Sequence, residues 1–469
     1  MVPARQETGD RLLAGRQRAG VAVFAQVAEC PHAVGGQHDR GDASAIPLTP
    51  LPSSTGSACR PWVAAPVMAV TIASPGTMQD GAMRRPLLPL VVTLAIVALP
   101  LASCADDAGP GSSQPATEDS TSPTPPDDRP SNGNGPNTPP STSKPATPQA
   151  AGTIADGLTT PWGLAFLPDG SALVSERDTA LVKRVSENGS VRTVGEVPGV
   201  DFSSAEGGLL GLAVTPPSQG PTYVYAYLST TQDNRVVRMP YAAGGLGKPE
   251  VVVDDIPVST YHNGGRVEFG PDGKLYVTTG DATEGGNAPD PDSLGGKILR
   301  LTPSGQPAPD NPTEGSPVWT LGHRNVQGIT WDARDNLWAS EFGQDTWDEL
   351  NLIEAGNNYG WPRYEGSANA PGFEDPDVQW RPDEASPSGI TYAQGSVWVA
   401  ALGGERLWRV PVDGADVVGQ PEAFFTGEYG RLRTVVPAPD GSLWLLTSNT
   451  DGRGDPAPGD DRIIRLTLG

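Results

Sequence analysis

Residues 264–278 read GGRVEFGPDGKLYVT, two alternating apolar segments joined by Pro271-Asp272-Gly273. A turn of this composition between alternating segments predicts a β-hairpin. His262 lies ten residues before Asp272, and Asp281 lies nine residues after it. Because the two strands of a hairpin run antiparallel with nearly equal rise per residue, this spacing predicts that His262 and Asp281 are neighbours.

The same hairpin phrase occurs six times, which predicts the fold. The copies read GLAFLPDGSALVSE, GLAVTPPSQGPTYVYAY, VEFGPDGKLYVTTG, GITWDARDNLWASE, GITYAQGSVWVAA and TVVPAPDGSLWLLTS. Their turns are spaced about 45 to 63 residues apart, roughly one four-stranded blade each, so we expect an all-β, six-bladed β-propeller. A pair of β-sandwiches or a parallel β-helix is the alternative.

In a propeller, the loop ends of the inner hairpins converge at one mouth of the central channel. Counting from the later turns pairs Arg324 with Gly343 and Arg433 with Asn449 at this same edge. A base, carboxylates, arginines and bare backbone collected there are typical of an active site. The residues expected at the mouth are Pro161, Trp162, Glu206, His262, Asp281, Arg324, Gly343 and Arg433.

Composition divides the chain into four parts. Residues 151–469 carry the apolar side chains of one folded domain, and residues 105–150 are a Pro/Ser/Thr-rich segment that we expect to be a disordered spacer. Residues 83–104 have two arginines, an apolar run and a small-residue end, as a signal peptide does. Residues 1–82 precede that signal, so we interpret them as a mis-assigned start, an unrecognised extension being the alternative.

The end of the signal segment, Leu101-Ala102-Ser103-Cys104, resembles the bacterial lipobox. The resemblance implies that Cys104 is lipidated and that the protein is held outside the cytoplasmic membrane by acyl chains alone. An ordinary secretory signal with an incidental cysteine is the alternative.

Charge and cysteine content exclude several functions. Residues 105–469 carry 24 basic and 49 acidic side chains, which argues against nucleic acid as a partner. The three cysteines, Cys30, Cys59 and Cys104, all precede the folded domain, so neither a disulfide framework nor a zinc site is expected there. The balance suits a calcium site or an uncharged ligand.

Two loops carry most of the remaining chemistry. Tyr261-His262-Asn263-Gly264-Gly265 places His262 beside paired glycines that would let backbone approach a ligand, and Asp281 would orient the imidazole for general-base catalysis. An ordinary packed histidine is the alternative. Residues 341–362 are rich in carboxylates and free carbonyls, which are hard ligands that suit Ca²⁺.

Seven motifs in order resemble the soluble glucose/sorbosone dehydrogenase family of quinoproteins. They are PWGLAFLPDG, EGGLLGLA, HNGGRVEFGPDGKLYVTTGD, GHRNVQG, EFGQDTWDELN, NNYGWP and GRLR, and they span about residues 155–468. The resemblance implies a six-bladed propeller that uses pyrroloquinoline quinone (PQQ) and calcium to oxidise sugars.

The resemblance also assigns roles. His262 would be the base on the anomeric hydroxyl, Asp281 its orienting partner, and Arg324 the group that steadies charge beside the quinone. Contacts to PQQ would come from Glu206, Asn325, Arg431 and Arg433. Calcium would be held by the backbone carbonyls of Gly343 and Gln344, and a second, structural calcium by Asp348, Glu349 and Tyr359.

One position departs from the family. Gly403 stands where the family's glucose dehydrogenases have a lysine that binds a PQQ carboxylate. The sequence therefore predicts a lipid-anchored, PQQ- and calcium-dependent enzyme that oxidises an aldose to a lactone and passes electrons to an acceptor that the sequence does not identify. The alternatives are a propeller that only binds its ligand and a calcium-dependent lactonase.

Overall fold

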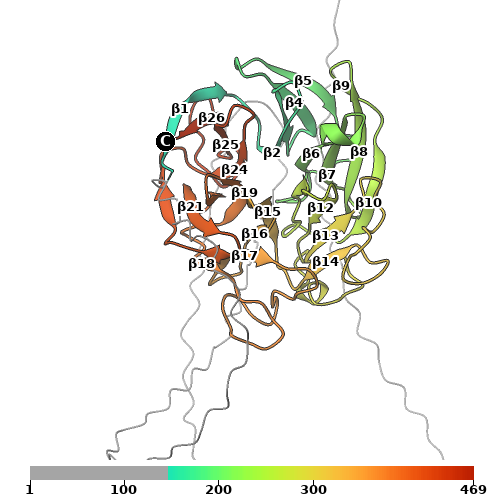
Figure 1. The fold of residues 1–469 in the computed structure, drawn as a ribbon. Coiled ribbons are helices and arrows are strands. Elements are labelled where there is room, and N and C mark those ends of the chain that lie inside the picture. The colour runs from blue at the N-terminus through green and yellow to red at the C-terminus, as the bar shows by residue number, and fades with distance from the viewer. Residues whose placement is uncertain (1–145) are drawn as a thin grey trace, which may run out of the picture. The chain divides into compact units, whose positions relative to one another are not determined.

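The computed structural model describes residues 146–469, which form 26 strands and no α-helix (Figure 1). Within this range no helix is long and apolar enough to cross a membrane. The predictions for residues 1–82, for the signal segment with Cys104 and for most of the spacer lie outside the described residues.

The strands form six antiparallel sheets arranged around a central axis, which confirms the predicted six-bladed propeller (Figure 1). The sheets contain β2 (Pro161–Phe166), β3 (Ala172–Glu176), β4 (Leu181–Val185) and β5 (Val191–Glu196); β6 (Leu209–Val214), β7 (Tyr223–Ser229), β8 (Asn234–Ala242), β9 (Gly245–Leu246) and β10 (Glu250–Ile256); β11 (Val267–Phe269), β12 (Leu275–Thr278), β13 (Lys297–Leu301) and β14 (Val318–Leu321); β15 (Val326–Trp331), β16 (Leu337–Glu341), β17 (Asp348–Ile353) and β18 (Val378–Trp380); β19 (Pro387–Ala393), β20 (Ser396–Ala401), β21 (Arg406–Asp413), β22 (Asp416–Val417) and β23 (Glu422–Phe424); and β24 (Leu432–Pro437), β25 (Leu443–Thr447) and β26 (Ile463–Leu468).

The last sheet is completed by the N-terminal strand β1 (Pro148–Ala155), which pairs antiparallel with β26. Pro148 lies opposite Leu468, so both ends of the folded domain are held in one blade. The domain therefore begins a few residues earlier than the predicted boundary at Ala151.

The inner strands of neighbouring blades approach so closely that their central position is glycine. A Cβ atom at Gly211 on β6 would overlap the carbonyl oxygen of Gly265, and one at Gly328 on β15 would overlap the carbonyl of Ser388. The repeated GLA and GIT phrases of the sequence thus mark the contact between blades.

The hydrophobic core lies between the blades rather than in one central mass. One cluster joins Tyr225 and Tyr227 of β7 to Val277 of β12 and Leu299 of β13, all nearly inaccessible to solvent. Similar clusters lie between the other pairs of sheets. Strands buried on both faces explain why these segments are almost continuously apolar. The rigid ring holds the loops at each mouth in fixed positions.

Candidate active site

His262 and Asp281 are neighbours, as the hairpin count predicts. His262 Nδ1 lies 2.7 Å from Asp281 Oδ1, and the Asp281 side chain is only 2% exposed. The same oxygen accepts a hydrogen bond from the Thr283 backbone N–H at 2.8 Å. With Nδ1 occupied by the carboxylate, Nε2 is the ring nitrogen left to act on a ligand.

The backbone of His262 is held in an unusual conformation. Its φ is 59°, a left-handed value that costs a non-glycine residue about 1 kcal/mol or more. The His262 N–H donates to Glu206 Oε2 at 3.0 Å, and its carbonyl accepts from the Ala282 N–H at 3.1 Å. Glu206 therefore positions the base, and it lines a second, smaller cavity described below.

A cavity of about 570 Å³ lies in front of the imidazole. Its lining includes His262, Asp281, Arg324, Trp361 and Glu365. The volume is within the range of small-molecule sites. The imidazole of His262, the carboxylate of Asp281 and the guanidinium of Arg324 thus line the same cavity.

Arg324 contacts Gly343, the residue that the hairpin count predicted to lie beside it. Its guanidinium donates to the carbonyls of Gly343 and, at 3.2 Å, of Phe342, while its backbone N–H donates to the Glu341 carboxylate. Burial lowers the pKa of Arg324, and the nearby carboxylates of Asp281 and Glu341 oppose this effect. The group remains a cation aimed at the site.

A second cavity of about 250 Å³ adjoins the first and is rich in arginine. Arg431 Nε donates to Asp451 Oδ2 at 3.0 Å, and Arg433 lies 3.7 Å from the same carboxylate. Burial lowers the pKa of Arg433 to about 9. Two further arginines that the sequence did not single out, Arg177 and Arg453, complete the lining.

The predicted pairing of Arg433 with Asn449 is wrong. Asn449 Oδ1 accepts from the backbone N–H of Arg431 at 2.8 Å instead. The cause is an unequal count, because Pro437 pairs with Leu443 around Asp440, and Arg433 lies seven residues before Asp440 whereas Asn449 lies nine after it.

Three buried donors at this mouth have no hydrogen-bond partner among residues 146–469. They are Arg324 Nε, Asn325 Nδ2 and Arg433 Nε. Asn325 uses only its oxygen, which accepts from the Gly264 N–H at 3.0 Å. Buried donors without acceptors are costly, so this arrangement fits a ligand rich in carboxylate and carbonyl oxygens, as PQQ is.

Gly403 has no room for the lysine that it replaces. A Cβ atom there would lie 2.6 Å from Ser386 Oγ and 2.9 Å from the Pro382 carbonyl. Arg177 and Arg453 line the arginine-rich cavity, which Leu402 beside Gly403 also lines. Their signal in the sequence was weak because Arg177 directly follows β3 and Arg453 lies in the connection between β25 and β26, both outside the hairpin count.

Gly343 and Gln344, the residues predicted to hold the first calcium, lie near both cavities. Phe342 lines the arginine-rich cavity and Gln344 lines the larger one, so Gly343 lies between them. The Gly343 carbonyl already faces a positive group, the Arg324 guanidinium, which suits a cation at this place.

The three residues predicted for a second calcium make hydrogen bonds within the protein, and their role as calcium ligands stays a prediction. Asp348 accepts from the backbone N–H groups of Gly343 and Ser386, and Glu349 accepts from that of Gly366. The Tyr359 hydroxyl donates to the Leu352 carbonyl. Burial raises the pKa of Asp348 to about 6 and that of Glu349 to about 8. Within residues 146–469 no three acidic, histidine or cysteine side chains are arranged to hold a metal.

The paired glycines beside His262 allow close packing. A side chain at Gly264 would overlap Thr279 of the same blade, and one at Gly265 would overlap Leu210 of β6 in the neighbouring blade. Their predicted role, close approach of the backbone to a ligand, stays a prediction.

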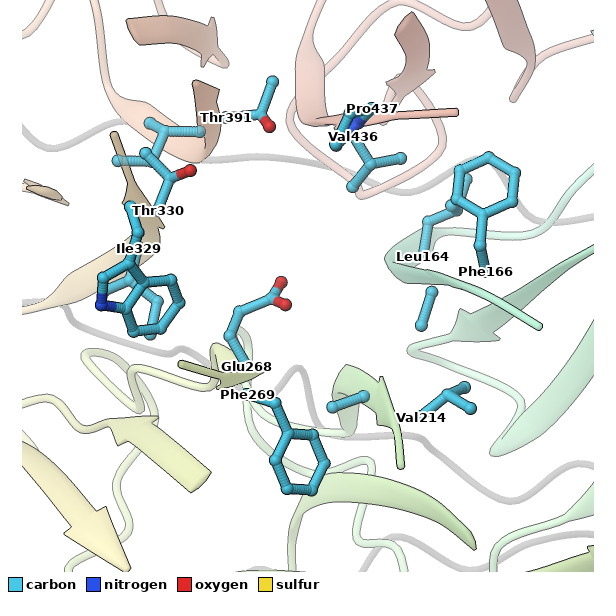
Figure 2. A pocket seen from close by; sticks show the side chains of 14 residues that line it. Leu164, Phe166, Val214, Glu268, Phe269, Ile329, Thr330, Thr391, Val436 and Pro437 are labelled. Atoms are coloured by element: carbon cyan, nitrogen blue, oxygen red, sulfur yellow. The ribbon is translucent and has the colours of Figure 1, made fainter. Parts of the chain in front are cut away.

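The opposite end of the channel is a separate cavity of about 320 Å³, lined by the inner strands of all six blades. Figure 2 shows the carboxylate of Glu268 projecting into it among mostly apolar side chains such as Leu164, Val214 and Val436. Burial raises the pKa of Glu268 to about 7, partly offset by Arg266. It is the only ionisable group in this lining.

Comparison with known proteins gives consistent matches over the folded domain. The Glucose / Sorbosone dehydrogenase family profile matches residues 158–464. The PQQ-bound form of an aldose sugar dehydrogenase from Streptomyces coelicolor is 55% identical, with a TM-score of 0.68 over 69% of this chain and 98% of that one. The aldose sugar dehydrogenase YliI of Escherichia coli is 29% identical over 64% of this chain and 90% of its own length. Quinoprotein glucose dehydrogenase B of Acinetobacter calcoaceticus is 33% identical over 47% of this chain and 54% of its own.

Proposed function

The chain belongs to the glucose/sorbosone dehydrogenase family, and on that premise we propose that it oxidises an aldose at C1 to the lactone with the help of PQQ and calcium. The relatives are all dehydrogenases by name, one being a quinoprotein and one having a solved PQQ-bound form. The choice of C1, the calcium and the place of the enzyme in the cell are the steps that we add.

The residues divide the reaction between two cavities. Arg177, Arg431, Arg433 and Arg453 would hold the carboxylates of PQQ, and the sugar would enter the larger cavity in front of His262. When bound, PQQ accepts the hydride that leaves C1. His262 Nε2 takes the proton of the C1 hydroxyl, so that the C1–O bond becomes the carbonyl of the lactone.

Asp281 and Arg324 support this proton transfer. The Asp281 carboxylate fixes the imidazole with its proton on Nδ1 and stabilises the positive charge that the ring acquires. Arg324, which lines the same cavity, would offer its unpartnered Nε to oxygen atoms that gain negative charge. Loss of the proton therefore takes place between an anion and a cation that are already in position.

Calcium would be held by the backbone carbonyls of Gly343 and Gln344 together with oxygens of the cofactor. A cation at Gly343 would replace the contact that this carbonyl now makes with Arg324. Carbonyl oxygens are suitable ligands for this ion. Its effect would be to draw electron density from the quinone.

The lipobox-like Leu101-Ala102-Ser103-Cys104 supports attachment to the outer side of the cytoplasmic membrane through Cys104. The excess of acidic residues speaks against a nucleic-acid partner, so the partners proposed are the sugar and an electron acceptor still to be identified.

The unpartnered donors Arg324 Nε and Arg433 Nε carry this proposal, because Arg324 lines the larger cavity and Arg433 the smaller one, where an oxygen-rich ligand would satisfy them; the buried Asn325 Nδ2 beside Arg324 also lacks a partner among residues 146–469. The test is reconstitution of the purified protein with PQQ and Ca²⁺, followed by an assay of aldose-dependent dye reduction and of lactone formation. Saturable PQQ binding without oxidation of any aldose would favour a propeller that only binds its ligand.

A further inference from the structure

Trp361 contacts both Asp281 and Arg324, although no role was predicted for it from the sequence. It lies in the long connection between β17 and β18. Its indole Nε1–H donates to Asp281 Oδ2 at 2.7 Å, while the other oxygen, Oδ1, holds His262. The Arg324 guanidinium carbon lies 5.4 Å from the Trp361 ring centre.

The backbone of this connection is fixed to the neighbouring blade. The Trp361 N–H donates to the Gly322 carbonyl at 2.9 Å, and the Tyr359 N–H donates to the Leu321 carbonyl at 3.0 Å. Asn358 pairs with Leu321 in a short parallel bridge. The indole is therefore placed by the same strand end that leads into Arg324, rather than by a free loop.

Resting on the function proposed above, we infer that Trp361 is a positioning residue that sets the basicity of His262 through Asp281, and that its ring is a wall of the sugar site. The N–H fixes the rotation of the carboxylate and takes up part of its negative charge. The ring faces the cavity of about 570 Å³, where the flat C–H face of a pyranose would pack against it.

The direction of the effect follows from the hydrogen bonds. Without the indole N–H, more of the negative charge of Asp281 is available to His262, which stabilises the imidazolium and raises the His262 pKa. A larger fraction of the base is then protonated and inactive at a given pH. The acid limb of the pH profile should therefore move to higher pH.

The other charged groups around His262 are the same in the wild type and in a variant of Trp361. They are Glu206 and Arg453 from two rim loops, Arg324 from the start of the next blade, and Arg363 and Glu365 from the connection that carries Trp361.

The experiment compares Trp361→Phe, which keeps an aromatic ring but loses the donor, with Trp319→Phe. Trp319 Nε1 is buried with no partner among residues 146–469, so the control removes an indole N–H that bonds nothing. The His262 pKa is read from the imidazole NMR signals of the intact protein without cofactor, the His262 signal being the one lost in His262→Ala. We expect a higher pKa in Trp361→Phe and no change in Trp319→Phe.

Steady-state kinetics of the PQQ-loaded protein distinguish the contribution of the Trp361 ring from that of its N–H donor. Trp361→Phe should lower kcat by about 3- to 30-fold with little change in KM, and Trp361→Leu, which removes the ring as well, should also raise KM. If Trp361→Phe does not fold, Trp361→Tyr takes its place. An unchanged His262 pKa in the folded variant overturns the inference. Absence of sugar oxidation by the wild type would contradict the proposed function, while the NMR result would still decide the role of Trp361.

Discussion

His262 precedes the first strand of a hairpin and Asp281 follows its second strand, and His262 Nδ1 lies 2.7 Å from Asp281 Oδ1. The carboxylate has a second donor in the Thr283 N–H and a third in the Trp361 indole. An anion fixed by three donors keeps the imidazole in one orientation, with Nε2 left for chemistry. The arrangement turns a half-buried histidine at the rim into a directed base.

Loss of one arginine from the smaller cavity should weaken PQQ binding without abolishing it. Arg431→Gln removes a cation that is paired only with Asp451 and leaves three others in the lining. A charge-assisted hydrogen bond is worth about 1.5 to 3 kcal/mol, so the Kd should rise by about 10- to 150-fold in calorimetric titration. Arg381→Gln, a surface change with 61% of the side chain exposed, is the control and should leave the Kd unchanged. Equal affinities in both variants would contradict the assignment of this cavity.

Glu268 should make the stability of the protein depend on pH. Its pKa is raised from 4.5 to about 7 in the folded state, so the folded protein holds its proton more tightly than the unfolded chain. The group therefore reduces stability as the pH rises from about 4.5 to 7. Glu268→Gln should melt like the wild type at pH 4.5 and about 2 to 5 °C higher at pH 8, as followed by circular dichroism. A difference that is independent of pH would show that the carboxylate is charged throughout.

Because the inner strands approach closely, replacing one of their glycines by alanine should lower the free energy of unfolding. In Gly211→Ala the new Cβ would overlap the backbone of Gly265 in the next blade, so the free energy of unfolding should fall by about 1 to 3 kcal/mol. Gly245→Ala, where the nearest atom to a Cβ is 3.5 Å away, is the matched control and should have little effect. Similar stability of the two variants in urea titrations would argue against the blade contact as described.

Membrane attachment is tested through Cys104. If it is the lipidated residue, protein expressed in a bacterial host from Met83 should partition with membranes, and Cys104→Ala should appear in the soluble fraction or remain unprocessed. Cell fractionation and the mass of the mature protein provide the measurement. Processing and anchoring of Cys104→Ala like the wild type would contradict the lipoprotein interpretation.

The sequence predicted best what depends on regular hairpins. Six turn phrases predicted six blades, and counting from a turn brought together His262 with Asp281 and Arg324 with Gly343. The count failed for Arg433, because Arg433 lies seven residues before Asp440 and Asn449 nine residues after it, whereas the strands pair symmetrically around Asp440. An unequal count does not bring two residues to the same point of a hairpin.

Residues from irregular connections were harder to predict. Arg177, Arg453 and Trp361 reach the site from loops whose course depends on contacts between blades. Gly403 was a known departure, yet only the structure shows that Ser386 and Pro382 fill the space a lysine would need. Gly403→Lys is therefore expected to disturb packing rather than to restore a cofactor contact. Strand β1 closes the ring through a pairing across the whole domain that no local pattern indicates.

The most direct test of the account is a single-turnover experiment on the PQQ-loaded protein, in which the absorption spectrum of the quinone is followed after an aldose is added. The wild type should reduce the cofactor rapidly. His262→Ala should bind PQQ with a normal spectrum and reduce it about 10² to 10⁴ times more slowly, and Asp281→Asn should also be slowed, through loss of imidazole orientation. Reduction of the quinone by His262→Ala at the wild-type rate would contradict the role of His262 as the base.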